Sequence, residues 1–323
     1  MNPIYDFGIL LIQGLQTMSP VLDGVMKFFS FLGTIEFYLL LIPFVYWLVN
    51  AQLGFRLLLV LISTDFLVLG FKQLLHQPRP YWIGDVRRLA EETSYGIPSS
   101  HASDSLAVWG YLAYRLKKDW LWALIGVVVL MIGFSRMYLA VHFPTDVLAG
   151  WLIGLVVIVI FARGEGWASS RLEKLSAGGQ IGTGFAISVL MILAGWIIGL
   201  LIAPFPDPPG WAGYALQARG ISHYFTLAGA LFGAAAGYAL MRKHAHFQAS
   251  GAGWQRVVRY LLGIAGVLVI YLGLDALFGL LAADESAIGL VLRYIRYGLV
   301  TFWAIFAAPW VFLKLKLAEP ANR

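Results

Sequence analysis

Long apolar runs separated by short polar connections dominate the pattern of this chain. Nine runs approach the roughly 20 mostly apolar residues that a membrane-spanning helix needs, at 34–49, 51–75, 98–115, 119–137, 145–162, 180–203, 219–242, 256–281 and 288–313. The runs at 98–115 and 145–162 are short and begin with polar residues, so we expect both to start inside a protein-lined cavity. The pattern predicts an all-α polytopic membrane helix bundle with about nine transmembrane helices.

The amino-terminal part has a different pattern. Over residues 1–33, apolar patches alternate with isolated polar residues, which is typical of helices lying in the membrane interface. A basic leader and a small-residue cleavage site are both missing, so we expect no cleavable signal peptide. The sequence therefore predicts three regions: an interfacial amphipathic segment at 1–33, core helices at 34–162 and additional transmembrane helices at 180–318.

Composition and charge exclude several classes of protein. Hydrophobic residues make up 60% of the chain and charged residues 12%, with a mean hydropathy of +0.77, which excludes an ordinary soluble domain. Most Lys and Arg residues fall at alternate connections between the runs, which marks those connections as cytoplasmic. Topology thus explains the net charge of +6, and we expect no nucleic-acid partner. Because the chain has no cysteine, disulfides and thiolate metal sites are excluded.

Several basic residues break this charge rule, among them Lys72, Arg79 and Arg136. A Lys or Arg at membrane depth costs about 2.5–3.5 kcal/mol on insertion scales, so it usually faces a partner or a wet cavity. The predicted topology brings three polar segments to the same outer face: KQLLHQPRP (72–80), PSSH (98–101) and SRMYLAVHFPTD (135–146). We therefore expect an anion between them.

The beginnings of two predicted helices would complete this anion site. Pro98 fits the first helical position, and behind it the backbone N–H groups of Ser99, Ser100 and His101 would lack intrahelical acceptors and point outward. Such a helix start binds anions, and it would face Lys72, Arg79 and Arg136. Point and forked donors together suit a phosphate group.

Pro144 predicts a second helix start, with chemistry around it. Asp146 would lie two residues further on and could reach back to one ring nitrogen of His142, which fixes the tautomer and frees the other nitrogen for attack. We infer that His142 is a nucleophile, that Asp146 orients it, and that His101 is the acid that protonates the leaving alkoxide. The three cations would hold the equatorial phosphate oxygens.

Other notable residues have structural interpretations. Arg293 and Arg296, with Asp275, are typical of an intramembrane ion-pair network, and Asp65 suits a structural partner of Lys72. Glycine spacings predict close helix packing at Gly150/Gly154, Gly195/Gly199 and Gly229/Gly233/Gly237.

The connection 81–97 lies beside the predicted cavity and could act as its lid. Arg87 and Arg88 could attract anionic headgroups there. They could equally belong to a solvated charge run balanced by Asp85, Glu91 and Glu92.

The three polar segments resemble the type 2 phosphatidic acid phosphatase superfamily, whose pattern is KxxxxxxRP, PSGH and SRxxxxxHxxxD. Lys72–Pro80 and Ser135–Asp146 match their parts, and Pro98–His101 matches with one change at Ser100. The resemblance covers about residues 34–162, which would be the phosphatase core. It implies a phosphohistidine on His142, acid and base work by His101, a supporting Asp146 and no cofactor or required metal. It also implies phosphate contacts from Lys72, Arg79, Ser99 and Arg136. Ser100, where the family commonly has glycine, would contact the phosphate through its backbone N–H.

Details within the motifs leave the substrate open. YGIPSSHA is similar to the sphingoid base phosphate phosphatases, whereas RPYW and nine spans are similar to glucose-6-phosphatase. We expect a multi-pass phosphomonoesterase of a bacterial-type cell membrane, with an extracytoplasmic site for a phosphorylated lipid among the membrane lipids. The alternatives are a sugar phosphate as substrate, a lipid phosphotransferase, or a transporter or scramblase. The sequence shows no internal repeat of the kind that transporters use, which counts against transport. The last helices would shape a lipid entrance or form a homo-oligomer face.

Overall fold

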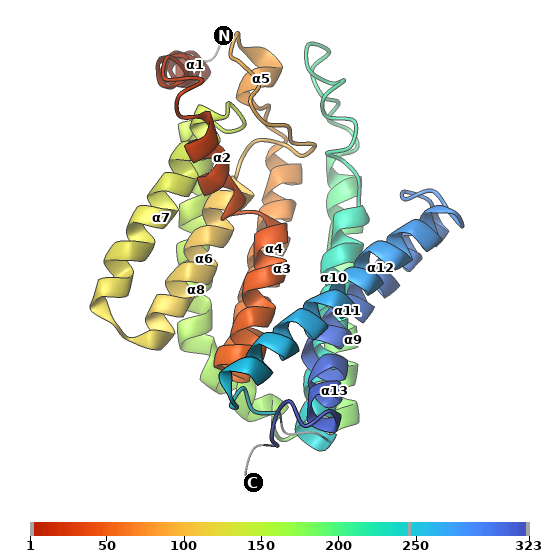
Figure 1. Ribbon diagram of the computed structural model, residues 1–323. Coiled ribbons are helices and arrows are strands. Elements are labelled where there is room, and N and C mark those ends of the chain that lie inside the picture. Colours follow the sequence, from red (N-terminus) through yellow and green to blue (C-terminus); the bar gives the residue numbers. More distant parts are fainter. Residues whose placement is uncertain (1–2, 245–246, 321–323) are drawn as a thin grey trace. The chain divides into compact units, whose positions relative to one another are not determined.

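The computed structural model describes residues 3–244 and 247–320, which are mostly helical and contain no strand. This confirms the all-α prediction (Figure 1). The helices are α1 (Pro3–Gln16), α2 (Asp23–Phe31), α3 (Ile35–Phe44), the π-helix η1 (Val45–Val49), α4 (Ala51–Leu75), α5 (Pro80–Ile83), α6 (Ser100–Leu116), α7 (Asp119–Tyr138), α8 (Pro144–Leu172), α9 (Ala177–Ile202), α10 (Ser222–His244), α11 (Gly253–Gly279), α12 (Ala287–Phe302), the π-helix η2 (Trp303–Ala307) and α13 (Ala308–Lys314).

The number of membrane spans is smaller than the sequence predicts. Seven segments of the described chain are long and apolar enough to cross a membrane: Ala51–Ile83, Asp119–Tyr138, Pro144–Leu172, Ala177–Ile202, Ser222–His244, Gly253–Gly279 and Ala287–Lys314. An eighth span is added if Asp23–Phe31 and Ile35–Val49, bent by 53° at their break, count as one. The count of nine is not confirmed, because α6, predicted as a span at 98–115, has only 17 residues.

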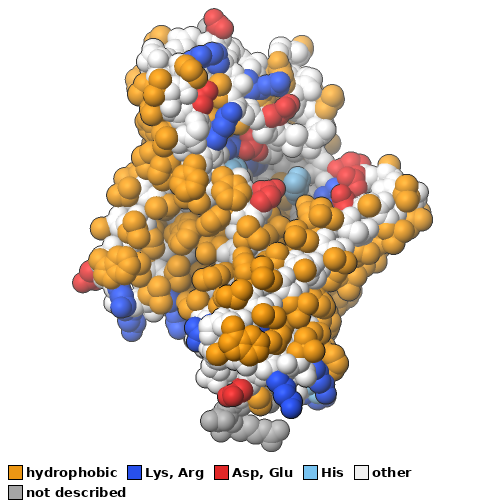
Figure 2. Space-filling view, viewed as in Figure 1, with side chains coloured by type: hydrophobic (Ala, Val, Ile, Leu, Met, Phe, Trp, Pro, Cys, Tyr) orange, Lys and Arg blue, Asp and Glu red, His pale blue; other side chains and the backbone are white. Residues whose placement is uncertain are grey.

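Exposed apolar side chains provide a surface suited to lipid contact. On α7, Leu124, Val127 and Leu130 are each more than half exposed and recur at helical spacing. Figure 2 shows hydrophobic side chains over most of the visible surface. An isolated aqueous protein rarely exposes so much contiguous apolar area.

The chain divides into two compact units. The first combines Met1–Tyr38, Ser63–Ala162 and Ile197–Gly220, and the second combines Leu39–Ile62, Arg163–Trp196 and Ile221–Arg323. Each unit therefore includes parts of more than one predicted region, because α4, α8 and α9 each contribute to both units.

In the first unit, close packing of α6 on α8 depends on two glycines. A Cβ atom on Gly150 would lie 2.5 Å from the carbonyl oxygen of Ser99, and one on Gly154 would lie 2.7 Å from that of Ser103. The predicted packing role of this glycine pair is confirmed. The absence of side chains at both positions lets α8 lie directly against the first turns of α6.

The amino-terminal helix α1 packs on the connection between α7 and α8. Gly8 lies against the ring of Phe143, and the Tyr5 ring stacks on the same ring with 4.9 Å between centroids. Ile4, Phe7 and Leu10 of α1 are more than half exposed. The structure thus has helices within the predicted interfacial segment, whose first two residues lie outside the described part.

In the second unit, α10 packs closely on α12. Gly229 and Gly233 lie against the backbone carbonyls of Tyr294 and Gly298, so their predicted packing role is confirmed. Nearby, Trp47 of η1 donates a hydrogen bond to the carbonyl of Ala304 in η2, with a donor–acceptor distance of 2.8 Å. Residues 245–246 of the predicted region 180–318 lie outside the described part.

Candidate active site

His142 lies in the short connection between α7 and α8, and it is 1% exposed. As predicted, Pro144 begins α8. Asp146 is therefore the third helical residue, and its Oδ2 accepts a hydrogen bond from the backbone N–H of Phe143 at 2.9 Å. This is the carboxylate half of a capping box, which holds Asp146 facing back along the chain toward His142.

Both ring nitrogens of His142 have defined partners. Nδ1 lies 3.2 Å from Oδ2 of Asp146, as the spacing predicts, and Nε2 lies 3.2 Å from Nη1 of Arg79. A guanidinium can only donate, so Nε2 must accept and the ring proton lies on Nδ1. Burial and the charges of Arg79 and Lys72 hold the pKa of the His142 imidazole well below its usual range. The ring is therefore neutral, with its Nε2 lone pair directed at the cations.

Lys72 and Arg79 are buried, and both fix the connection between α5 and α6. Nζ of Lys72 donates to the carbonyl of Tyr95 at 2.6 Å and to that of Gly96 at 3.1 Å. Nε of Arg79 donates to the carbonyl of Ser94 at 2.6 Å. The cations bind backbone oxygens of this segment and so hold it over the site, which agrees with the predicted position of 81–97 beside the cavity.

Arg136, at the end of α7, is the third cation of the site and is also buried. One terminal nitrogen donates to Oγ of Ser30, and the other pairs with the carboxylate of Glu92. Its Nε is buried without a hydrogen-bond partner. The second oxygen of Glu92 lies 4.0 Å from Nη2 of Arg79, so one carboxylate faces two arginines.

Glu92 is a charged residue of this site that the sequence did not single out, because it entered only as one of the acids that could balance Arg87 and Arg88 in a solvated charge run. Burial alone would raise the pKa of the Glu92 carboxyl, but Arg136 and Arg79 outweigh it and bring the pKa well below the usual range. The carboxylate is therefore ionised. The only available sequence signal was its position in the connection next to the PSSH segment.

The start of α6 differs from the prediction. The helix begins at Ser100, and Ser99 is its N-cap, with Oγ accepting from the backbone N–H of Ala102 at 3.4 Å. Pro98 is therefore not the first helical residue, because the Ser99 side chain caps a helix that begins two residues after Pro98. The backbone N–H of Ser99 is not free either, since it donates to the carbonyl of Asp146 at 2.9 Å.

Two further donors remain at this helix start. Ser100 and His101 are the first two helical residues, whose N–H groups have no intrahelical acceptor. Charges of Arg136, Glu92, Arg79 and Lys72 act on the His101 ring, and His101 in turn acts on His142. The structure thus brings together both histidines, all three cations and Asp146 within one unit. It gives Ser99 a capping role.

A polar and aromatic cluster supports the connection over the site from its other side. Oη of Tyr95 donates to Asp207, which also accepts from Nε of Arg219 at 2.7 Å. Trp82 and Tyr95 pack with Trp211 in the same cluster. The segment that follows α9 therefore holds Tyr95, whose carbonyl accepts from Lys72.

Asp65 of α4, which precedes Lys72 along the same helix, and Asp104 of α6 are two further carboxyl groups inside the bundle. Asp65 interacts electrostatically with Lys72, as predicted, and also hydrogen-bonds to Asp104. Among the described residues, no group of three or more His, Asp or Glu side chains is arranged to hold a metal ion.

Two family models match this chain. Residues 53–169 match the PAP2 superfamily, and residues 225–320 match the transmembrane extension of PAP2 superfamily phosphatases. The chain belongs to the PAP2 superfamily. Its apolar helices and the matched extension make it an integral multi-pass membrane protein.

Curated relatives of this PAP2 protein differ in their substrates. It is 26% identical over 231 residues to glucose-6-phosphatase catalytic subunit 1 of Haplochromis nubilus, covering 62% of this chain and 66% of the relative. Phosphatidylglycerophosphatase B of Bacillus subtilis is 35% identical over 107 residues, covering 29% of this chain and 53% of the relative. Lipid phosphate phosphatase delta of Arabidopsis thaliana is 27% identical over 205 residues, covering 58% and 48%. The chain therefore spans between about half and two thirds of the length of these relatives.

A solved structure is also similar to this PAP2 protein. It is the crystal structure of a transmembrane PAP2 type phosphatidylglycerolphosphate phosphatase from Bacillus subtilis, with 26% sequence identity and a TM-score of 0.46. The match covers 53% of this chain and 88% of that chain.

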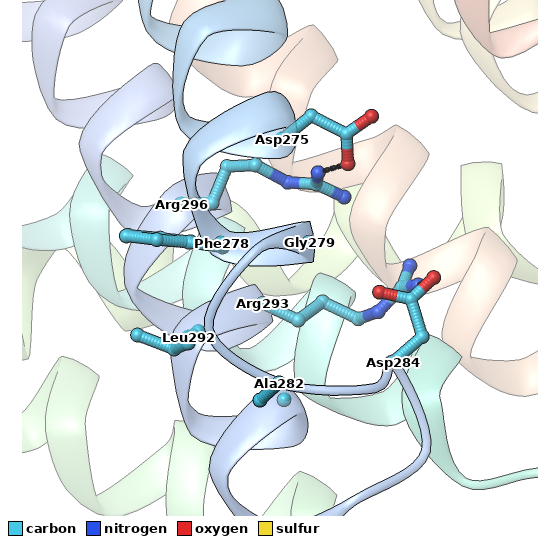
Figure 3. A pocket seen from close by; sticks show the side chains of 9 residues that line it. Asp275, Phe278, Gly279, Ala282, Asp284, Leu292, Arg293 and Arg296 are labelled. Carbon is cyan, nitrogen blue, oxygen red and sulfur yellow. Dashed lines mark hydrogen bonds and ion pairs between the residues drawn. The ribbon is translucent and has the colours of Figure 1, made fainter.

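The PAP2 transmembrane extension contains a separate charged cluster, shown in Figure 3. Arg296 pairs with Asp275, as predicted, and Nη2 of Arg293 lies 3.0 Å from Oδ2 of Asp284. The cavity between them has a volume of about 10 Å³, which is about one water molecule. The pair of Arg296 with Asp275 agrees with the sequence, whereas Arg293 pairs with Asp284 of the connection between α11 and α12, which was not predicted.

Proposed function

We propose that this protein is a membrane phosphatase that hydrolyses a phosphomonoester through a phosphohistidine on His142, and that a lipid phosphate is its favoured substrate. The observation that carries the proposal is the environment of the His142 ring. Asp146 holds the proton on Nδ1, and Nε2 faces Arg79 among buried cations. This combination provides a neutral nucleophile beside the charges that bind its target.

In the first step, the Nε2 lone pair of His142 attacks phosphorus in line with the ester bond. Burial and the charge of Arg136 lower the pKa of the His101 imidazole, so His101 takes up its proton as the phosphate dianion binds beside it. The P–O bond breaks, and the leaving oxygen takes this proton from His101. Arg79, Arg136 and Lys72 stabilise the charge on the equatorial oxygens, while Asp146 balances the positive charge that develops on the ring. The products of this step are an alcohol and phosphohistidine.

In the second step, water replaces the alcohol. His101, now neutral, removes a proton from the water as its oxygen attacks phosphorus, and the N–P bond breaks. Inorganic phosphate leaves, and both histidines return to their starting states. The two steps as proposed use water and side chains of this chain.

A lipid phosphate is favoured by the position of α1 beside the site. This helix packs on Phe143, the neighbour of His142, and it exposes Ile4, Phe7 and Leu10. Such an apolar edge suits the membrane interface, so the site would lie near the level of lipid headgroups. The names of two relatives, phosphatidylglycerophosphatase B and lipid phosphate phosphatase delta, support the same substrate class.

We further propose that the site faces the extracytoplasmic side. His142 follows the end of α7, whereas Arg115, Lys117 and Lys118 lie around the connection before the start of α7. A 20-residue helix spans about 30 Å, so these basic residues would lie at the opposite membrane surface. Basic connections mark the cytoplasm.

The experiment is a substrate panel on the detergent-solubilised protein, with His142→Ala as the blank. Phosphatidate, a sphingoid base phosphate and glucose 6-phosphate are compared by release of inorganic phosphate. In water labelled with ¹⁸O, hydrolysis places one labelled oxygen in the phosphate, whereas phosphotransfer to another alcohol does not. Equal phosphate release by wild type and His142→Ala would refute the proposal.

A further inference from the structure

The carboxylate of Glu92 lies where an anion is expected in this site. One oxygen pairs with Arg136, and the other is 4.0 Å from Nη2 of Arg79. Nη1 of the same Arg79 contacts Nε2 of His142 at 3.2 Å. A phosphate under attack by His142 and held by both arginines would need the space and the donors that the carboxylate now uses.

The side chain of Glu92 can leave without opening the connection. Its backbone is held by Tyr81, whose Oη donates to the Glu92 carbonyl at 2.9 Å and accepts from the Glu92 N–H at 3.2 Å. Ser94 and Tyr95 are held by Arg79. The Glu92 side chain retains 27% exposure, so rotation about its own bonds can carry the carboxylate toward solvent.

An internal anion also solves an electrostatic problem. Lys72, Arg79 and Arg136 are all at least 97% buried; Arg79 and Arg136 disfavour the charge of Lys72, and Arg136 disfavours that of Arg79. Buried cations need a partner of opposite charge, whether or not a phosphate is present. Glu92 supplies that charge to the two arginines when the site holds no substrate.

We propose that Glu92 is a resident counter-ion, which occupies the phosphate position between turnovers and competes with phosphate for Arg79 and Arg136. This inference rests on the proposed phosphatase function. Substrate phosphate must displace the carboxylate, which weakens binding. The same competition weakens retention of the product phosphate, because the carboxylate returns as phosphate leaves.

The test is binding of inorganic phosphate to the full-length protein by isothermal titration calorimetry, together with the inhibition constant of phosphate in the hydrolysis assay. Glu92→Gln keeps the shape of the side chain but removes its charge. We expect it to bind phosphate about tenfold more tightly, the ratio that corresponds to losing one competing charged hydrogen bond. Glu92→Asp keeps the charge on a shorter side chain that cannot reach both arginines equally. Its affinity for phosphate should therefore lie between those of the wild type and Glu92→Gln.

Glu91 provides a matched control. It is the adjacent residue, its side chain is 69% exposed, and it pairs with Arg88 on the surface. Glu91→Gln should leave phosphate affinity unchanged. Phosphate affinity that is unchanged or weaker in Glu92→Gln would overturn the inference, and so would a loss of kcat with unchanged affinity, since Glu92 would then position Arg136 for catalysis.

The two readouts separate failure of this inference from failure of the proposed function. Calorimetry requires no turnover, so tighter phosphate binding by Glu92→Gln can be measured even if no phosphomonoester is hydrolysed. If wild type hydrolyses phosphomonoesters and Glu92→Gln does not bind phosphate more tightly, only the counter-ion role is refuted.

Discussion

Asp146→Asn tests the central contact of the proposed mechanism. In the wild type, Oδ2 of Asp146 accepts from the backbone N–H of Phe143 at 2.9 Å and lies 3.2 Å from Nδ1 of His142. Asparagine has the same shape but only one acceptor oxygen and no charge. Because Oδ2 makes both contacts, an amide oxygen in that position keeps the Phe143 N–H and still accepts the Nδ1 proton, and only the negative charge is lost. The reversed amide would lose the Phe143 N–H and would turn the ring proton to Nε2.

The expected loss can be worked from these contacts. Removing a charged hydrogen bond from the ring costs about 1.5–3 kcal/mol, which corresponds to about 10–100-fold in rate. Only the reversed amide would hold the wrong tautomer and bring the loss toward about 10⁴-fold, as in other His–Asp pairs. We expect the orientation that keeps the Phe143 N–H, so kcat should fall by about 10–100-fold with little change in KM, because the phosphate-binding cations are untouched. The folded state should lose only about 1 kcal/mol, since the Phe143 N–H keeps an acceptor.

The assay is initial-rate release of phosphate from a short-chain phosphate ester, with thermal unfolding measured on the same preparations. Glu165→Gln is the control, because Glu165 pairs with Arg56 in the other compact unit. A kcat of Asp146→Asn within threefold of wild type would refute the role of the carboxylate. Normal kcat with raised KM would refute it too, since Asp146 would then act in binding.

Three further predictions follow from other contacts. Burial holds the pKa of His142 below its usual value near 6.5, so the acid limb of kcat/KM due to this ring should lie below pH 6.5. The free energy of unfolding should fall with acid once the ring of the unfolded chain begins to protonate near pH 6.5. An acid limb at or above that pH would contradict the neutral ring. Gly150→Ala should lower the free energy of unfolding by about 1–3 kcal/mol and lower kcat/KM, because the new Cβ would meet backbone atoms of α6. Gly126→Ala is the control, since a Cβ there has nothing within 4 Å and should change neither quantity. Equal effects of the two variants in thermal or denaturant unfolding would refute the packing argument. Asp207→Asn loses the partner of Tyr95 and should raise KM with kcat changed by less than about twofold, and an unchanged KM would show that this support is dispensable.

Local parts of the site could be predicted from the sequence. His142 and Asp146 are four residues apart, and Pro144 between them fixes where α8 begins, so the contact of the carboxylate with Nδ1 follows from the geometry of one helix turn. The apolar runs predicted the long helices for a similar reason, since a helix in lipid satisfies its own backbone hydrogen bonds. The count of nine spans is not confirmed at α6, because hydropathy does not specify where a serine cap begins a helix.

Contacts between distant segments were decided only by the tertiary structure. Glu92 is 44 residues from Arg136, and it lies in a connection with no periodic pattern, so nothing in the sequence distinguished it from exposed Glu91. The Ser99 N–H meets the carbonyl of Asp146 only because Gly150 lets α6 and α8 approach. Composition and spacing thus determined a helical membrane protein with a histidine–aspartate pair and a set of cations. The path of the chain between helices decided which anion those cations hold, because long-range charge pairing depends on three-dimensional packing and not on the spacing of residues along a helix.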